Sequence, residues 1–75
     1  MDDLVRIMKA WMRRENLNGT KLQKLLSTID AKVCNVTMYL ADPGTVSLDC
    51  RKRIETAFVH LTIRYKAAKL FRKEN

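Results

Sequence analysis

The chain has 75 residues, a net charge of +7 at pH 7 and a sequence pI of about 9.9. This length holds one small domain, which leaves little room for an enzyme active site. The charge favours a polyanionic partner, because lysine and arginine release counterions when they neutralise phosphates. The sequence lacks a run of 18 apolar residues and a Gly-rich phosphate loop, so we expect neither a membrane span nor a nucleotide site.

An amphipathic helix is predicted near the start of the chain. Its apolar side chains recur at helical spacing and are Leu4, Val5, Ile7, Met8, Trp11 and Met12. Acidic residues at its start and arginines at its end suit the helix dipole. Residues 15–19 should end the helix, with asparagine or glycine taking the left-handed closing position. We expect this helix to dock on the segment that follows.

Residues 20–41 are predicted to form two helices joined by a tight turn. Thr20 can cap the first helix, which carries Leu22, Leu25 and Leu26 on one face. Residues 27–30 interrupt the helical pattern, and Asp30 can cap the second helix. That helix, over residues 31–40, is expected to bury Val33, Val36 and Leu40 and to turn Lys32, Asn35 and Tyr39 outward.

A tight turn and a long last helix are predicted after residue 41. Asp42-Pro43-Gly44-Thr45 suits a type II turn, with glycine supplying a positive φ. Ser47 offers a cap for a helix over about residues 48–71. The side chains predicted to pack against the earlier helices are Ile54, Ala57, Phe58, Leu61, Tyr65 and Ala68.

The last helix carries a second apolar stripe, made of Val59, Ile63, Ala67 and Leu70. Leaving it in water would expose an apolar patch on a small protein. We therefore expect a homodimer through this stripe, so that residues 47–71 serve as a dimerisation element. The alternative is that the stripe folds back on the first helix within one monomer.

The residues from Val36-Thr37 to Val46-Ser47 resemble, without gaps, the headpiece of lac-repressor family regulators. The resemblance continues through Arg51, Ile54, Glu55, Ala57 and Leu61. The added first helix is similar to that of the related lambda-repressor and Cro class. The resemblance implies one all-α domain over residues 1–75, with four or five helices and a helix-turn-helix at about 20–41.

The same resemblance implies a function in transcription. The chain would be a cytoplasmic, nucleoid-associated regulator that binds double-stranded DNA sequence-specifically as a homodimer, in the manner of phage or mobile-element repressors. The predicted DNA contacts are Lys21, Lys32, Val33, Cys34, Asn35, Thr37, Met38, Thr45 and Arg51. Val33, Cys34 and Met38 occupy the base-reading positions, and none can make a bidentate bond to a base. Val33 has the spacing of a core residue as an alternative.

Two other functional hypotheses stay open. A protein-interaction module, such as an antirepressor or assembly factor, could keep the helix-turn-helix shape and use the apolar Val33, Cys34 and Met38 surface to bind a partner protein. Non-specific packaging or RNA binding would use the basic last helix, which belongs to a segment with eight basic and three acidic residues after position 45. Few aromatic residues are available for stacking on single strands.

The reactive side chains predict no chemistry of their own. Cys34, Cys50 and His60 lack the spacing of a zinc site, and no catalytic set accompanies them, so we expect no metal, no cofactor and no enzymatic activity. The small number of cysteines favours intracellular thiols. A disulfide between Cys34 and Cys50 and a redox role for Cys34 are alternatives to a buried, inert Cys34.

Overall fold

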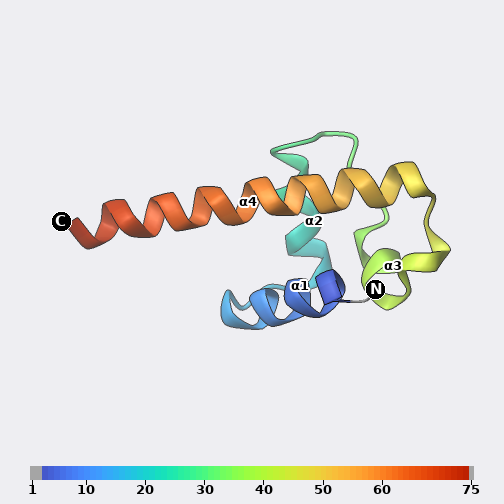
Figure 1. Cartoon of the computed structure of the whole chain (residues 1–75), viewed down its shortest axis with the longest axis horizontal. Helices are drawn as coiled ribbons and strands as arrows, with labels where there is room; N and C mark the ends of the chain where they lie inside the picture. Colours follow the sequence, from blue (N-terminus) through green and yellow to red (C-terminus); the bar gives the residue numbers. More distant parts are fainter. Residues whose placement is uncertain (1–2, 75) are drawn as a thin grey trace.

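The computed structural model describes the backbone of residues 3–74 and the side chains of residues 4–66. Its α-helices are α1 (Asp3–Arg14), α2 (Gly19–Ser27), α3 (Val36–Ala41) and α4 (Leu48–Glu74), and a short 3-10 helix, η1 (Pro43–Thr45), joins α3 to α4 (Figure 1). No strand occurs within residues 3–74. The all-α fold of four helices with a long last helix, expected from the sequence, is confirmed.

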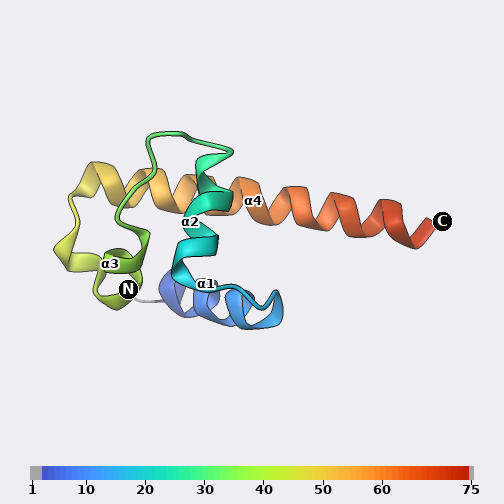
Figure 2. The ribbon, with the colours of Figure 1, turned by 180° about the vertical axis from the view of Figure 1, so that it is seen from behind.

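Helix α4 is the longest helix, and the other helices pack against it. It contains 27 residues, which corresponds to a length of about 40 Å. The first three helices lie against its N-terminal part, and its C-terminal part projects beyond them in both views (Figures 1 and 2). The α2 helix crosses α4, whereas α1 and α3 lie along one side of it.

One hydrophobic core joins the helices. Trp11 of α1 meets Phe58 of α4 edge to face with ring centroids 5.6 Å apart, and meets Tyr65 at 5.1 Å. These contacts pack α1 on α4, and the buried residues of α1 and α2 belong to the same core. The buried apolar side chains are Val5, Met8, Trp11, Met12, Leu22, Leu26, Val33, Val36, Tyr39, Leu40, Cys50, Ile54, Ala57, Phe58 and Leu61. Ile7, predicted on the apolar side of α1, is instead 57% exposed.

The connection between α1 and α2 confirms one prediction and corrects another. Asn16 has a φ of 56°, so an asparagine does take the left-handed position that ends α1. The cap of α2 is Asn18, not Thr20, because the Asn18 side-chain oxygen accepts a hydrogen bond from the Lys21 amide at 2.9 Å. Thr20 lies inside the first turn.

The prediction of a tight turn and a second helix from residue 31 is wrong. Residues 28–35 form a loop, longer than the turn of about three or four residues that helix-turn-helix proteins use. Asp30 accepts a hydrogen bond from the Lys32 amide at 3.0 Å without starting a helix. Asn35 then adopts a left-handed φ of 58°, which delays the helix until Val36.

Two further predictions are corrected around α3. Tyr39 faces the core and is 1% exposed. Its hydroxyl is satisfied there, because it donates a hydrogen bond to Glu55 Oε2 at 2.8 Å. The segment after α3 is a 3-10 helix rather than a type II turn, since Gly44 has no positive φ and its amide donates to the Asp42 carboxylate at 3.0 Å. The Ser47 cap of α4 is confirmed by a 3.2 Å hydrogen bond from the Cys50 amide to Ser47 Oγ.

Candidate nucleic-acid interface

The α2 and α3 helices are held together by two close contacts. A Cβ atom at Gly19 would lie 2.9 Å from Thr37 Oγ1, so the start of α2 passes directly over the first turn of α3. Gln23 of α2 accepts a hydrogen bond from the Val36 amide at 3.3 Å through its side-chain oxygen. Asn35 makes no side-chain cap for α3. Gln23 therefore satisfies an amide at the start of α3 that would otherwise lack a partner.

These contacts bring polar and basic side chains from both helices to one place. Thr20, Gln23, Lys24, Ser27 and Thr37 line a shallow depression between α2 and α3. The hydroxyls and the Lys24 ammonium are groups that proteins use to contact the phosphates and sugars of a DNA backbone. We call Thr20, Lys21, Lys24, Thr37 and Met38 the α2–α3 surface; all five are exposed.

Helix α3 offers a small outward face. It has six residues, which makes it about 9 Å long. Val36, Tyr39 and Leu40 are buried, so the exposed residues are Thr37, Met38 and Ala41. Met38 is 48% exposed. This face can bring one hydroxyl and an apolar side chain to a base edge, where a thymine methyl is a suitable apolar contact.

The structure brings together only some of the predicted DNA contacts. Lys21, Thr37 and Met38 belong to the α2–α3 surface. Lys32 is exposed on the loop, but Figure 1 shows the outer part of this loop on the opposite side of α4 from α3. Val33 is 4% exposed and belongs to the core, so its prediction as a DNA contact is wrong.

The remaining predicted DNA contacts outside the α-helices, Cys34, Asn35 and Thr45, are all exposed. Asn35 is exposed in its left-handed conformation directly before α3. Thr45 is exposed in η1, and its hydroxyl donates a 2.8 Å hydrogen bond to the Asp42 carbonyl. Cys34 is exposed, which corrects the interpretation of a buried, inert thiol. Cys50 is buried, and its thiol donates to the Cys34 carbonyl oxygen at 3.2 Å.

Arg51 and Arg53, near the start of α4, differ in their polar contacts. Arg53 is paired with Asp30 at 3.2 Å and with Asp49 at 3.6 Å, so it ties the loop to α4. The hydrogen bond from the Lys32 amide, followed by the interaction with Arg53, lowers the pKa of the Asp30 carboxyl. Arg51 is half-buried, and its Nε has no hydrogen-bond partner within the described part of the chain.

The sequence analysis did not identify Thr20, Gln23 and Lys24 as neighbours of Thr37 in the candidate interface. Helical spacing could have identified Thr20 and Lys24. They lie four residues apart on α2, on a different face from the buried Leu22 and Leu26. Gln23 could not be found in this way, because its role depends on where α3 begins.

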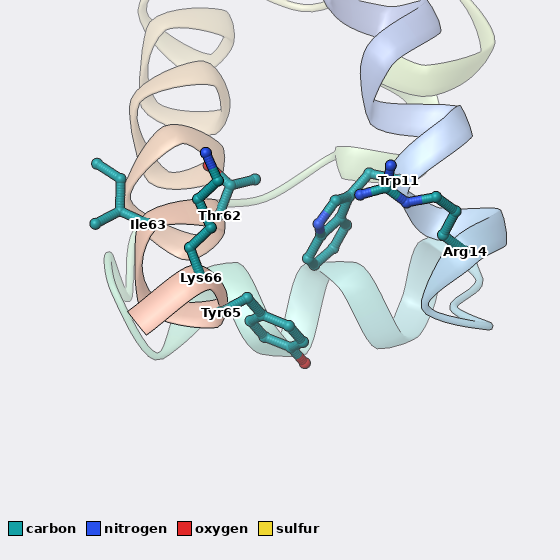
Figure 3. Close-up of a pocket in the computed structure, with 6 residues that line it drawn as sticks. All are labelled: Trp11, Arg14, Thr62, Ile63, Tyr65 and Lys66. Carbon is teal, nitrogen blue, oxygen red and sulfur yellow. The ribbon is translucent and has the colours of Figure 1, made fainter. Parts of the chain in front are cut away.

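The predicted dimer stripe is exposed where the structure describes it. Val59 is 49% exposed and Ile63 is 59% exposed, one turn apart on α4. Ala67 and Leu70 lie outside the residues whose side chains are described. Figure 3 shows a hollow between the end of α1 and α4, with Trp11 facing Tyr65 and with Ile63 directed away from Trp11 on the outer side of α4.

Within the described residues, no helix has both the length and the apolar character that a bilayer crossing requires. Comparison of the chain with protein-family models, with curated proteins and with solved structures finds no match.

Proposed function

We propose that this chain binds double-stranded DNA through the α2–α3 surface and regulates transcription as a homodimer that occupies an operator. The proposal rests on the locking of α2 to α3, which brings Lys24 and the hydroxyls of Thr20 and Thr37 to one depression. Lys21 and Met38 are exposed on the same two helices. The net charge of +7 supports a polyanionic partner. Lysines and hydroxyls would hold the backbone, while Thr37 and Met38 would meet base edges.

Selection from a random duplex library at physiological salt tests this proposal. Enrichment of an inverted repeat would support a dimeric, sequence-specific regulator, with half-sites about one DNA turn apart. Binding without enrichment would point to packaging of DNA. Absence of binding to any duplex would refute the proposal.

A pair of charge-matched variants separates local contacts from overall charge. Lys21→Ala/Lys24→Ala removes two lysines from the α2–α3 surface. Lys9→Ala/Lys66→Ala removes two exposed lysines from α1 and α4, so its net charge equals that of the first variant. If the two surface lysines contact phosphates in both protomers of the dimer, the first variant should reduce the slope of log K against log salt by about 3.6, and the control should change it little. Equal losses in both variants would contradict a local interface.

The homodimer part of the proposal rests on the exposed apolar residues of α4. Val59 and Ile63 lie on one side of the helix, where a second copy can cover them. Ile63→Lys should yield a folded monomer in sedimentation measurements. Ile7→Lys is the matched control, because Ile7 is exposed to a similar extent, 57% against 59%, on a different helix. A dimer that survives Ile63→Lys would refute this interface.

The apolar face of α3 favours a second candidate function. Met38 and Ala41 are exposed beside a single hydroxyl, a composition that also suits contact with a partner protein. In that case Met38→Ala would weaken binding to the partner protein, and no duplex would be enriched from the library. A change in base preference caused by Met38→Ala would support the DNA-binding function instead.

A further inference from the structure

Two cysteines that lie far apart in the sequence meet beside the start of α3. Cys34 is exposed near the end of the loop, two residues before α3, and Cys50 lies buried in the first turn of α4. The Cys50 thiol donates a hydrogen bond to the Cys34 carbonyl oxygen at 3.2 Å. That oxygen is only three bonds from the Cβ atom of the same residue. The Cys50 sulfur is therefore already close to the space that the Cys34 side chain can reach.

The geometry points to Cys34 and Cys50 as a reversible dithiol that closes to a disulfide by exchange with a small-molecule disulfide such as glutathione disulfide. Closure of this disulfide involves the two thiols alone and does not depend on DNA binding. Burial raises the pKa of the Cys50 thiol, and the neighbouring Cys34 thiol raises it further, which is consistent with two thiols in close proximity.

Exposure assigns the two cysteines different parts in the exchange. The Cys34 thiolate attacks one sulfur of glutathione disulfide, and that disulfide bond breaks as a bond between Cys34 and glutathione forms. One glutathione leaves as a thiolate and takes up a proton. Cys50 then loses its proton to solvent and attacks the Cys34 sulfur, which releases the second glutathione. Two protein thiols are oxidised to one disulfide, and one glutathione disulfide is reduced to two thiols.

The loop provides both the proximity and the freedom that the bond requires. A disulfide needs its two Cβ atoms about 3.8 Å apart, and Cys34 stands on non-helical backbone that can adjust toward Cys50. Buried Val33 and the ion pair between Asp30 and Arg53 keep the loop beside α4. The bond would close a short chain segment and restrict the unfolded state.

Incubation of the whole chain with glutathione disulfide, followed by intact mass measurement, tests the inference. We expect the native chain to lose the mass of two hydrogens and to keep no glutathione. Cys50→Ser should accumulate one glutathione on Cys34, because the second attack is impossible. Cys34→Ser should react several times more slowly, because Cys50 is buried. Native protein that retains glutathione as Cys50→Ser does would refute the pairing.

Thermal melting and amide exchange of the oxidised chain test whether the native fold accommodates the disulfide. The oxidised chain should show a Tm higher by on the order of 10 °C than the reduced chain, and reductant should reverse the change. Amide exchange over residues 28–36 should slow in the oxidised chain. An oxidised chain that melts at or below the Tm of the reduced chain would show that native geometry cannot hold the bond, which would overturn the inference even if the disulfide forms.

Discussion

Gly19 is the residue at which the packing of α2 on α3 can be tested most sharply. In Gly19→Ala, the new Cβ would lie 2.9 Å from Thr37 Oγ1 and 3.8 Å from Leu40 Cδ1. Forcing an extra carbon into a packed site costs about 1–3 kcal/mol. Alanine in place of a helical glycine returns about 0.4–1 kcal/mol. From the middle of each range, we expect the substitution to lower the free energy of unfolding by about 1 kcal/mol.

The same substitution should change sign when the opposing hydroxyl is removed. In a Thr37→Ala background the nearest atoms to the new Cβ lie at 3.7 Å and 3.8 Å, which is ordinary van der Waals contact. Gly19→Ala should then stabilise the chain by about 0.4–1 kcal/mol. Urea unfolding of the four proteins, followed by circular dichroism, gives both values. Equal effects of Gly19→Ala in the two backgrounds, within about 0.5 kcal/mol, would refute the close approach of the helices.

Three further predictions concern the body of the fold. Ile54 is fully buried, so Ile54→Ala should cost about 2–5 kcal/mol in urea unfolding, and an unchanged midpoint would contradict its central position. Asn18→Ala should cost about 1 kcal/mol by loss of the α2 cap, whereas Asn18→Asp should retain most of the stability. The Lys32 amide and Arg53 lower the pKa of Asp30, so its contribution to stability is complete above the ordinary carboxyl pKa and is lost as the pH falls through the folded value. Asp30→Asn should therefore be less stable than the native chain near neutral pH, and the difference should shrink on acidification; a difference that stays constant with pH would contradict this role.

Long helices with repeated apolar spacing were predictable from the sequence. The inner face of α4 repeats over several turns, so the pattern at Ile54, Phe58 and Leu61 admits one interpretation. The end of α1 was also predictable, because asparagine is one of the few residues that enters the left-handed region readily.

The start of α3 was not predictable, because two different structures share its sequence pattern. Val33 stands three residues before Val36, so a helix that begins at residue 31 would bury both. Both are buried in the structure as well, but Val33 reaches the core from the loop, without helical backbone, and Val36 from the first position of α3. The choice depends on tertiary contacts, namely the Asp30–Arg53 ion pair and the acceptance of the Val36 amide by Gln23. Neither contact leaves a periodic signal.

The candidate interface was predictable in part for the same reason. Lys21, Thr37 and Met38 fall on segments that are helical both in the prediction and in the structure. Lys32 and Asn35 depended on the extra helical turns before Val36, which do not form. The resemblance assigned Val33 to a base-reading position on a helix. That assignment cannot be carried over, because α3 begins at Val36, three residues after Val33.

Helix α3 depends on contacts with the other helices for its order, and the hydrogen bond from the Val36 amide to Gln23 is one of them. A helix of six residues has too few internal hydrogen bonds to persist alone. Helix α2 supplies both the acceptor for its first amide and the surface at Gly19 on which it packs, and α4 adds the acceptor for the Tyr39 hydroxyl. The two helices should consequently open and close as one cooperative unit, with similar amide protection. Any partner that steadies α2 would then also raise the population of an ordered α3, and so would complete its own binding surface.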